Sequence, residues 1–459
     1  MVSRRVVIVG GSDAGISAAL RAKQVDPGAS VEVVVADAYP NYSICGIPFF
    51  LSGEVQHSAS LAHRTAREIE RAGVHLRLET LATEIDPTAG RLRVEGPGGT
   101  ERLPYDTLVL GTGATPRRPD GDGFEHPAVY PLHGMGTAFR ALEGLRANPQ
   151  RVIVVGSGYI GLEMADALRV RGVDDVTLVG SSPAPLPTVD PELGALVREE
   201  LERGGVRVID GTRVRAIEDA GGGRARVLGG EGFAGEADLV VLSTGVVPET
   251  SLGTACGLKT GEGGALRVDR RMGTKLAGVL AAGDCVETWH RILERPVWLP
   301  LGTTAHKQGR VAGENAAGGA AAFAGTLGTQ IVKVFELAIG RTGLDESEAR
   351  LAGHDAATIA FSGRDHKAYY PGATETHVRV VGDRGTGRLL GAQLVGHWRS
   401  GVAKRLDVFA AALHLGLAVT EVLDLDLSYT PPLGSPWDVV QQAAEAWDLR
   451  WRRQTDSSG

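Results

Sequence analysis

The sequence predicts an α/β protein in which two parallel-sheet units of one design precede a C-terminal α+β unit. Residues 4–24 with 31–37, and residues 150–170 with 174–182, each read as an apolar strand, a glycine-rich turn, a helix and a second apolar strand. This order is the βαβ unit of a Rossmann-type dinucleotide-binding domain. One such motif is a weak signal, whereas two copies in the same strand–turn–helix context are a strong one.

The last third of the chain has a different pattern. Strand-like runs at 329–339, 376–383 and 388–396 precede a helical stretch at 402–417. We therefore expect an α+β unit appended to two Rossmann-type domains. The polar tail RRQTDSSG is expected to fray.

Composition restricts the classes of function. The 459 residues include 48 basic and 55 acidic side chains, and the formal charge of −7 argues against a globally basic nucleic-acid binder. Cys45, Cys256 and Cys285 are too few for a disulfide framework and favour a reducing compartment. No segment reads as a membrane helix, and the apolar run at 6–9 is too short for a signal peptide. We expect a soluble, cytoplasmic protein without a nucleic-acid partner, a membrane partner or a resident metal.

The first glycine-rich turn is a degenerate dinucleotide fingerprint. Gly10 allows the tight turn, Gly15 lets the helix pack on the strand, and Ser12 replaces the middle glycine. The helix N-terminus then points backbone N–H groups at a pyrophosphate. Asp37 ends the second strand, where its carboxylate either accepts hydrogen bonds from an adenosine ribose or is a solvated turn residue.

The second turn has the complete fingerprint, Gly156, Gly158 and Gly161. The following strand ends in Ser181 and Ser182, where NAD sites usually have a carboxylate and NADP sites have an arginine nearby. Hydroxyls can donate to a 2′-phosphate, and no carboxylate repels it. We predict a site that prefers NADPH, with use of NADH left open.

Cys45 lies in PNYSICGIPFFLSGE, just after the first βαβ unit. With this segment, the two fingerprints and the motifs TGATP (112–116), STGVVP (243–248), AAGDC (281–285) and YTPPLGSPWD (429–438), the chain resembles the pyridine nucleotide–disulfide oxidoreductases over essentially its whole length. Within that family it resembles the single-cysteine branch, which contains coenzyme A disulfide reductase, NADH oxidase and NADH peroxidase.

The resemblance makes Cys45 the redox residue. Glutathione-reductase-like members have a second cysteine five residues later, where this chain has Phe50, so an internal redox disulfide is absent. The CGIP turn is expected to place Cys45 at a helix N-terminus, where the thiolate is favoured. We interpret Cys256 and Cys285 as small buried side chains.

The resemblance also assigns FAD to the first turn and NAD(P)H to the second. Asp284 would bind the ribityl chain, Tyr159 would cover the nicotinamide side of the flavin, and Glu163 would help to seat the nicotinamide. The residues expected to contact FAD are Gly10, Ser12, Asp13, Ala14, Gly15, Asp37, Ser43, Thr112, Gly113, Asp284, Leu301 and Thr303. Those expected to contact NAD(P)H are Gly156, Gly158, Tyr159, Ile160, Gly161, Glu163, Ser181, Ser182 and Gly245.

Three domains and a homodimer follow from the same resemblance. The domains are an FAD-binding domain at 1–118 and 249–325, an NAD(P)H-binding domain at 119–248 and a dimerisation domain at 326–459. Tyrosines of the partner subunit are expected to reach the cysteine, and the candidates are Tyr369, Tyr370 and Tyr429. Because adjacent side chains on a strand point in opposite directions, only one of Tyr369 and Tyr370 should reach it.

Two polar residues depart from the family pattern near the expected flavin. Asp13 stands where oxidases and peroxidases have an active-site histidine. It either relays protons beside Cys45 or bonds local N–H groups in the turn. His306 stands where the coenzyme A enzymes often have asparagine, and it is either functional or a residue of the helix start.

The expected substrate site departs from that pattern too. The coenzyme A enzymes use an asparagine before the cysteine and a basic residue near the C-terminus, where this chain has Ile44 and Trp437. The carrier is therefore left open. The candidate substrate-binding residues are Arg21, Lys23 and Arg71.

These observations favour an enzyme that passes electrons from NAD(P)H through FAD to a low-molecular-weight disulfide or persulfide held on Cys45. One alternative is an NAD(P)H oxidase or peroxidase in which Cys45 cycles through sulfenic acid. The absence of histidine at position 13 argues mildly against it. A metal or metalloid reductase and a redox-sensing flavoprotein are further alternatives.

Overall fold

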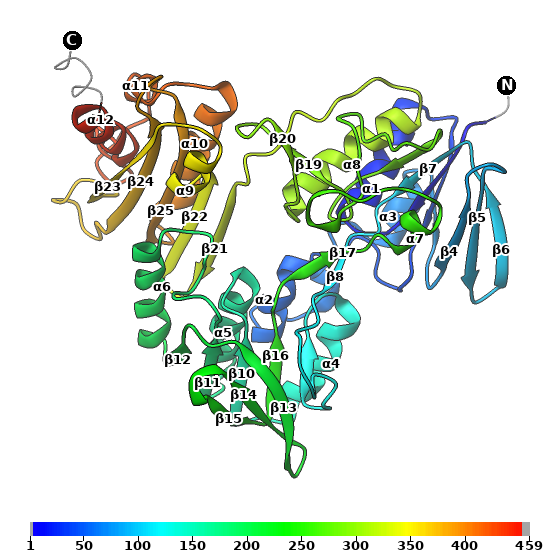
Figure 1. Cartoon of the computed structure of the whole chain (residues 1–459), viewed down its shortest axis with the longest axis horizontal. Helices are drawn as coiled ribbons and strands as arrows, with labels where there is room; N and C mark the ends of the chain where they lie inside the picture. Colours follow the sequence, from blue (N-terminus) through cyan, green and yellow to red (C-terminus); the bar gives the residue numbers. More distant parts are fainter. Residues whose placement is uncertain (1–2, 452–459) are drawn as a thin grey trace.

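The computed structural model describes residues 3–451, and the predicted polar tail lies outside them. The chain forms three bodies (Figure 1). The first body is built from two stretches of the chain, one before β8 (Ala114–Pro116) and one after β17 (Val246–Pro248) that ends with α8 (Gly302–Ala316). The second body lies between these stretches in the sequence, and the third begins at β21 (Gln330–Val334). The antiparallel pair of β8 with β17 connects the first two bodies.

A parallel five-stranded sheet of order β18-β7-β1-β2-β3 forms the centre of the first body. Its strands are β1 (Arg5–Val9), β2 (Ser30–Val34), β3 (Val74–Arg77), β7 (Thr107–Leu110) and β18 (Val279–Ala281). Most residues of β1 are β-branched and buried, as in a sheet covered on both faces. The remaining elements are α1 (Asp13–Val25), α2 (Ile47–Ser52), α3 (Ala66–Arg71), α7 (Ser251–Ala255), the sheet β4 (Leu81–Asp86), β5 (Arg91–Gly96) and β6 (Gly99–Pro104), and the hairpin β19 (Thr288–His290) with β20 (Arg295–Val297).

Helices α1 and α8 pack together unusually closely on this sheet. A Cβ atom at Gly309 would lie 2.2 Å from the carbonyl oxygen of Ala14, and one at Gly313 would lie 2.1 Å from that of Ala18. Only glycine fits at these two positions, so the sequence of α8 fixes how near it comes to the N-terminal turn of α1.

The second body repeats the first design. Its parallel sheet has the order β12-β11-β10-β16-β9. The strands are β9 (Val129–Pro131), β10 (Arg151–Val155), β11 (Asp175–Val179), β12 (Val206–Ile209) and β16 (Leu239–Leu242), covered by α4 (Met135–Arg146), α5 (Tyr159–Arg171) and α6 (Pro191–Arg203). A smaller antiparallel sheet contains β13 (Val214–Gly221), β14 (Arg224–Gly229) and β15 (Ala234–Ala237).

The third body is an antiparallel sheet of order β21-β22-β25-β24-β23 covered by helices, as expected for an α+β unit. Its strands are β21, β22 (Leu337–Gly343), β23 (Ala356–Arg364), β24 (Glu375–Asp383) and β25 (Leu389–His397). Its helices are α9 (Glu346–Leu351), α10 (Val402–Leu415), α11 (Val419–Leu423) and α12 (Val439–Trp451). The single strand predicted at 329–339 is wrong, because Phe335 adopts a left-handed φ of 48° and turns the segment into a hairpin.

Candidate active site

Steric fit forces the first glycine-rich turn against the sheet. Gly10 has φ of +110°, and a Cβ atom there would lie 2.0 Å from the carbonyl oxygen of Gly111. A Cβ atom at Gly15 would lie 1.9 Å from the carbonyl oxygen of Gly10. Since no other residue fits, α1 begins directly at the end of β1, with Ser12 as its N-cap and Asp13, Ala14 and Gly15 in its first turn.

The carboxyl ends of three further parallel strands bring other residues predicted to bind FAD to the same sheet edge as this turn. Asp37 follows β2, Thr112 and Gly113 follow β7, and Asp284 follows β18. Asp37 is exposed, and one oxygen of its carboxylate accepts the Tyr39 N–H at 2.8 Å. Such an edge is where open α/β sheets bind dinucleotides.

The second turn has the same geometry. Gly156 has φ of +112°, and a Cβ atom at Gly161 would lie 1.8 Å from the carbonyl oxygen of Gly156. A Cβ atom at Gly158 would meet no atom within 4 Å, so the N-terminus of α5 faces open space. Gly245 follows β16 and lies at the same edge of this sheet, with φ of +88°. A phosphate has access to the N–H groups of Tyr159 and Ile160 there.

The strand end predicted to select the nucleotide lies beside a charged pair that the sequence analysis missed. Ser181 is exposed and Ser182 is half-buried. The Gly211 N–H donates to the carbonyl oxygen of Ser182 at 2.8 Å, which brings the end of β12 against this strand end. Asp210 there pairs with Arg198 of α6 at 2.8 Å. Only the order of the sheet strands reveals this neighbour.

The negative charges of three predicted residues from different segments act on the Cys45 thiol. The thiol lies in a single turn of 3-10 helix, Ile44–Gly46, directly before α2. Partial enclosure by protein and the negative charges of Glu163, Asp13 and Asp284 raise the pKa of Cys45 above its ordinary value, although solvent still reaches the residue. The expectation that a helix N-terminus favours the thiolate is therefore wrong for this chain, because α2 has only six residues and three carboxylates oppose it.

Two of these carboxylates retain their protons unusually well. Burial and the charge of Asp166 raise the pKa of Glu163 to about 7. Burial and the charge of Asp13 raise the pKa of Asp284 to about 6. Acids with such values can hold or release a proton near neutral pH.

Asp13 and His306 are in contact across the two closely packed helices. His306 Nε2 lies 3.5 Å from Asp13 Oδ1, and His306 Nδ1 lies 2.7 Å from the Ser17 hydroxyl. Leu301 is the N-cap of α8, and Thr303 is exposed in its first turn. Asp13 and His306, which both depart from the family pattern, thus contact each other.

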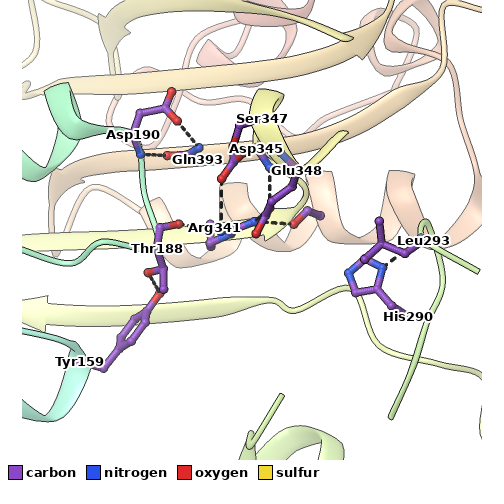
Figure 2. Close-up of polar contacts among 11 residues, drawn as sticks. Tyr159, Thr188, Asp190, His290, Leu293, Arg341, Asp345, Ser347, Glu348 and Gln393 are labelled. Carbon is purple, nitrogen blue, oxygen red and sulfur yellow. Dashed lines mark hydrogen bonds and ion pairs between the residues drawn. The ribbon is translucent and has the colours of Figure 1, made fainter. Parts of the chain in front are cut away.

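Tyr159, the first residue of α5, is held by a residue that the sequence analysis did not select (Figure 2). The Thr188 hydroxyl donates to the phenolic oxygen of Tyr159 at 3.4 Å. Arg341 of β22 donates to the Thr188 carbonyl oxygen at 2.7 Å and pairs with Glu348. A chain of polar contacts therefore links Tyr159 to the third body.

Comparison with known proteins decides the family. The model for the pyridine nucleotide-disulphide oxidoreductases matches residues 4–309, and the model for their dimerisation domain matches residues 329–439. This chain belongs to the pyridine nucleotide-disulphide oxidoreductase family. The membership confirms the predicted fold class, the resemblance and the oxidoreductase class, and the family implies FAD beside a pyridine nucleotide, as predicted.

Two similar proteins have sulfur chemistry in their names, and a third is named as an oxidase. An NAD(P)H sulfur oxidoreductase (CoA-dependent) from Pyrococcus furiosus is 36% identical, covering 95% of this chain and 98% of its own. The structure of an NAD-dependent persulfide reductase from A. fulgidus is 35% identical, with a TM-score of 0.93, and the match covers 97% of this chain and 83% of that one. An NADH oxidase from Methanocaldococcus jannaschii is 30% identical over 96% of this chain and 98% of its own.

The residues of this family member fit FAD at the first sheet edge. The turn at Gly10 leaves backbone N–H groups at the start of α1 without a side chain in front of them. Among residues 3–451, no side chain or N–H group hydrogen-bonds the half-buried Asp284 carboxyl, which suits the hydroxyls of a ribityl chain. Ser43 lies beside Cys45, anchored by its N–H to the carbonyl oxygen of Leu61 at 2.8 Å.

The three candidate substrate residues have different surroundings. Arg21 pairs with Glu314 at 2.6 Å, and Lys23 donates to the carbonyl oxygens of Pro27 and Ala29. Arg71 is exposed.

A basic strip that the sequence analysis missed runs beside Cys45. The His63 N–H donates to the carbonyl oxygen of Asn41 at 2.9 Å, so the chain from 61 to 63 follows that from 41 to 43. His63, Arg64 and Arg67 are exposed there. The run HRTARE after the cysteine motif was the available signal.

The three predicted tyrosines belong to the third body, whereas Cys45 lies directly before α2 of the first body. Tyr369 and Tyr370 lie in the turn between β23 and β24, so the strand assumed for them is wrong. All three are exposed. No helix among residues 3–451 is long and apolar enough to cross a membrane, and no cluster there could hold a metal ion.

Proposed function

We propose that this enzyme uses NAD(P)H to reduce a low-molecular-weight disulfide or persulfide at Cys45. The observation that supports this function most directly is the isolation of the thiol. Cys256 is half-buried, Cys285 is buried, and all three cysteines are free. The position five residues after Cys45 is the buried Phe50. Because no second thiol accompanies Cys45, the sulfur it exchanges with has to come from the substrate.

The residues around Cys45 would hold the reactants and their protons. FAD, when bound at the edge formed by Gly10, Asp37 and Asp284, supplies transfer of an electron pair from the nicotinamide to the sulfur. Tyr159 covers the nicotinamide position and moves aside when NAD(P)H binds. Glu163, with its pKa raised to about 7, is half-protonated near neutral pH and can donate to the carboxamide or to water.

The basic strip is suited to an anionic carrier. Arg64 and Arg67 of this strip are exposed before and on α3, next to the chain that leads into Cys45. The exposed Arg71 ends the same helix. Exposed guanidinium groups bind phosphate in bidentate fashion, so a thiol with a phosphorylated handle would be held with its sulfur at Cys45. Arg21 and Lys23 contribute less, since both already have partners.

The C-terminal body would complete the site in a homodimer. Tyr369, Tyr370 and Tyr429 are exposed together on one face of that body, and we assign them to the partner subunit's reactive cysteine. We propose an FAD-binding domain at 1–118 and 249–325, an NAD(P)H-binding domain at 119–248 and a dimerisation domain at 326–459. We also propose that the enzyme works in the cytoplasm, where a free reactive thiol persists.

The experiment is the intact mass of freshly purified, denatured protein before and after reductant, followed by assays with persulfides, disulfides and dioxygen. A reductant-sensitive adduct on Cys45 would identify the carrier, and Cys45→Ser should abolish persulfide turnover while flavin stays bound. Cys256→Ser is the matched control and should leave turnover unchanged. A mass increase of one or two oxygens, with turnover only on dioxygen or peroxide, would instead assign oxidase or peroxidase chemistry.

A further inference from the structure

Helices α1 and α8 place a carboxylate, an imidazole and a hydroxyl in one row. Asp13 Oδ1 lies 3.5 Å from His306 Nε2, and His306 Nδ1 lies 2.7 Å from the hydroxyl of Ser17. Ser17 is buried at 8% exposure, so the imidazole is held from behind by a fixed group. Both ring nitrogens are thereby oriented, and the one that faces the site is directed at Asp13.

One end of the row faces solvent, and the charge at the other end acts on Cys45. The His306 side chain is 54% exposed, whereas that of Asp13 is 26% exposed. The charge of Asp13 acts on Cys45, as described above. A Cβ atom at Gly302 would lie 3.1 Å from Asp13 Oδ2, so glycine at this position leaves the second carboxylate oxygen uncrowded.

We propose that Asp13 and His306 form a proton relay that protonates the thiolate leaving Cys45. This inference rests on the proposed function. The mixed disulfide Cys45–S–S–R takes up two electrons supplied by NAD(P)H and one proton, its S–S bond breaks, and the products are the Cys45 thiolate and R–SH. His306 Nε2 passes a proton to the Asp13 carboxylate, Asp13 passes it on to R–S⁻, and a proton from solvent restores the exposed imidazole. His306 is a positioning residue here, because it acts through Asp13.

The charges that face His306 come from two helices. From α1 they are Asp13 and, about two helical turns further along, Arg21, which pairs with Glu314 of α8. On α8 itself the neighbours are Lys307 and Arg310. Asp13 is therefore the acidic group in contact with the imidazole, and any charge that His306 carries acts on Cys45 through this contact.

The test measures the pH dependence of Cys45 alkylation by iodoacetamide in the FAD-loaded enzyme, with the modified peptide quantified by mass spectrometry. Only the thiolate reacts, so this readout reports the charge around Cys45 without any turnover. The variants are Asp13→Asn, His306→Asn and the double variant, with His306→Gln as a second replacement. Lys307→Gln removes the adjacent cation that does not contact Asp13, and it serves as the matched control.

The relay predicts opposite effects of the two single variants. Asp13→Asn should speed alkylation at pH 7 by roughly threefold to tenfold, because one negative charge is lost, yet slow persulfide turnover. His306→Asn and His306→Gln should slow alkylation by a similar factor. The double variant should behave like Asp13→Asn, since His306 acts only through that carboxylate.

Two outcomes would overturn the relay. One is an alkylation profile of both His306 variants that matches wild type or Lys307→Gln. The other is an effect of His306→Asn that persists in the Asp13→Asn background. Failure of the wild-type enzyme to reduce persulfides or disulfides would instead contradict the proposed function. The alkylation rates of the single and double variants would still report whether Asp13 and His306 control the reactivity of the Cys45 thiol.

Discussion

The Thr188 hydroxyl donates a hydrogen bond to the phenolic oxygen of Tyr159 at 3.4 Å, and Arg341 of the third body holds the Thr188 backbone at 2.7 Å (Figure 2). Asp190 in the same loop is fixed by Gln393, whose amide donates to its carboxylate at 2.9 Å. Tyr159, which we propose covers the nicotinamide position, is thus held by a loop of its own body that residues of the C-terminal body fix in place.

Thr188→Val should make Tyr159 easier to displace. The contact is long, so its loss costs about 0.5–1 kcal/mol, and the KM for NAD(P)H should fall roughly twofold to fivefold with kcat little changed. Thr188→Ser keeps the hydroxyl and is the control. Initial-rate kinetics measure both constants. Equal KM values for the valine and serine variants would contradict the retention of Tyr159 by this hydroxyl.

Asp37→Ala should weaken the retention of FAD. Its exposed carboxylate uses one oxygen for the Tyr39 N–H and leaves the other for a ribose hydroxyl, a charge-assisted bond worth about 1.5–3 kcal/mol. The flavin-to-protein ratio after dialysis should drop. Asp26→Ala is the matched control, because Asp26 also accepts a turn N–H, from Gly28 at 3.0 Å, at the opposite end of β2. Equal flavin content in the two variants would remove the role of Asp37.

The local parts of the nucleotide sites followed from the sequence alone. The turns at Gly10 and Gly156 need only an apolar strand, a glycine and a helix start, all of which lie within one short segment. The parallel sheets then bring Asp37 and Asp284 to the same edge, as strand–turn–helix order implies.

The contacts that tune the site could not be read from the sequence. Ser17 and His306 are 289 residues apart, and their meeting depends on the packing of α8 at Gly309 and Gly313 against α1. The effect of three carboxylates on Cys45 also depends on tertiary distances, so a local argument from the CGIP turn gave the wrong sign. The sequence analysis did not predict the hairpin at Phe335, because this residue adopts a left-handed φ and no glycine or asparagine there indicates a turn.

Ser181→Arg should shift the nucleotide preference toward NADPH. The residue is exposed just after β11, and an added guanidinium group would bind a 2′-phosphate at the position that we propose for the adenosine ribose. The ratio of kcat/KM for NADPH to that for NADH should rise about tenfold, which is 1.4 kcal/mol of discrimination. Arginine at the nearby exposed Pro183 is the control. An unchanged ratio at position 181 would move the adenosine site elsewhere.

Glu163→Gln should change how stability depends on pH in flavin-free protein. The folded-state pKa of about 7 lies above the ordinary 4.5, so between these values the unfolded chain releases its proton first and wild-type stability falls as pH rises. Glutamine removes this loss. The free energy of unfolding of the variant relative to wild type should therefore increase by about 2 kcal/mol between pH 5 and pH 8, allowing for partial exposure of the carboxyl.

Urea unfolding at the two pH values measures this difference in free energy, with Glu199→Gln on the exposed face of α6 as the control. A difference between Glu163→Gln and wild type that stays constant with pH would mean that Glu163 ionises at its ordinary value and lacks the proton assigned to it near neutral pH.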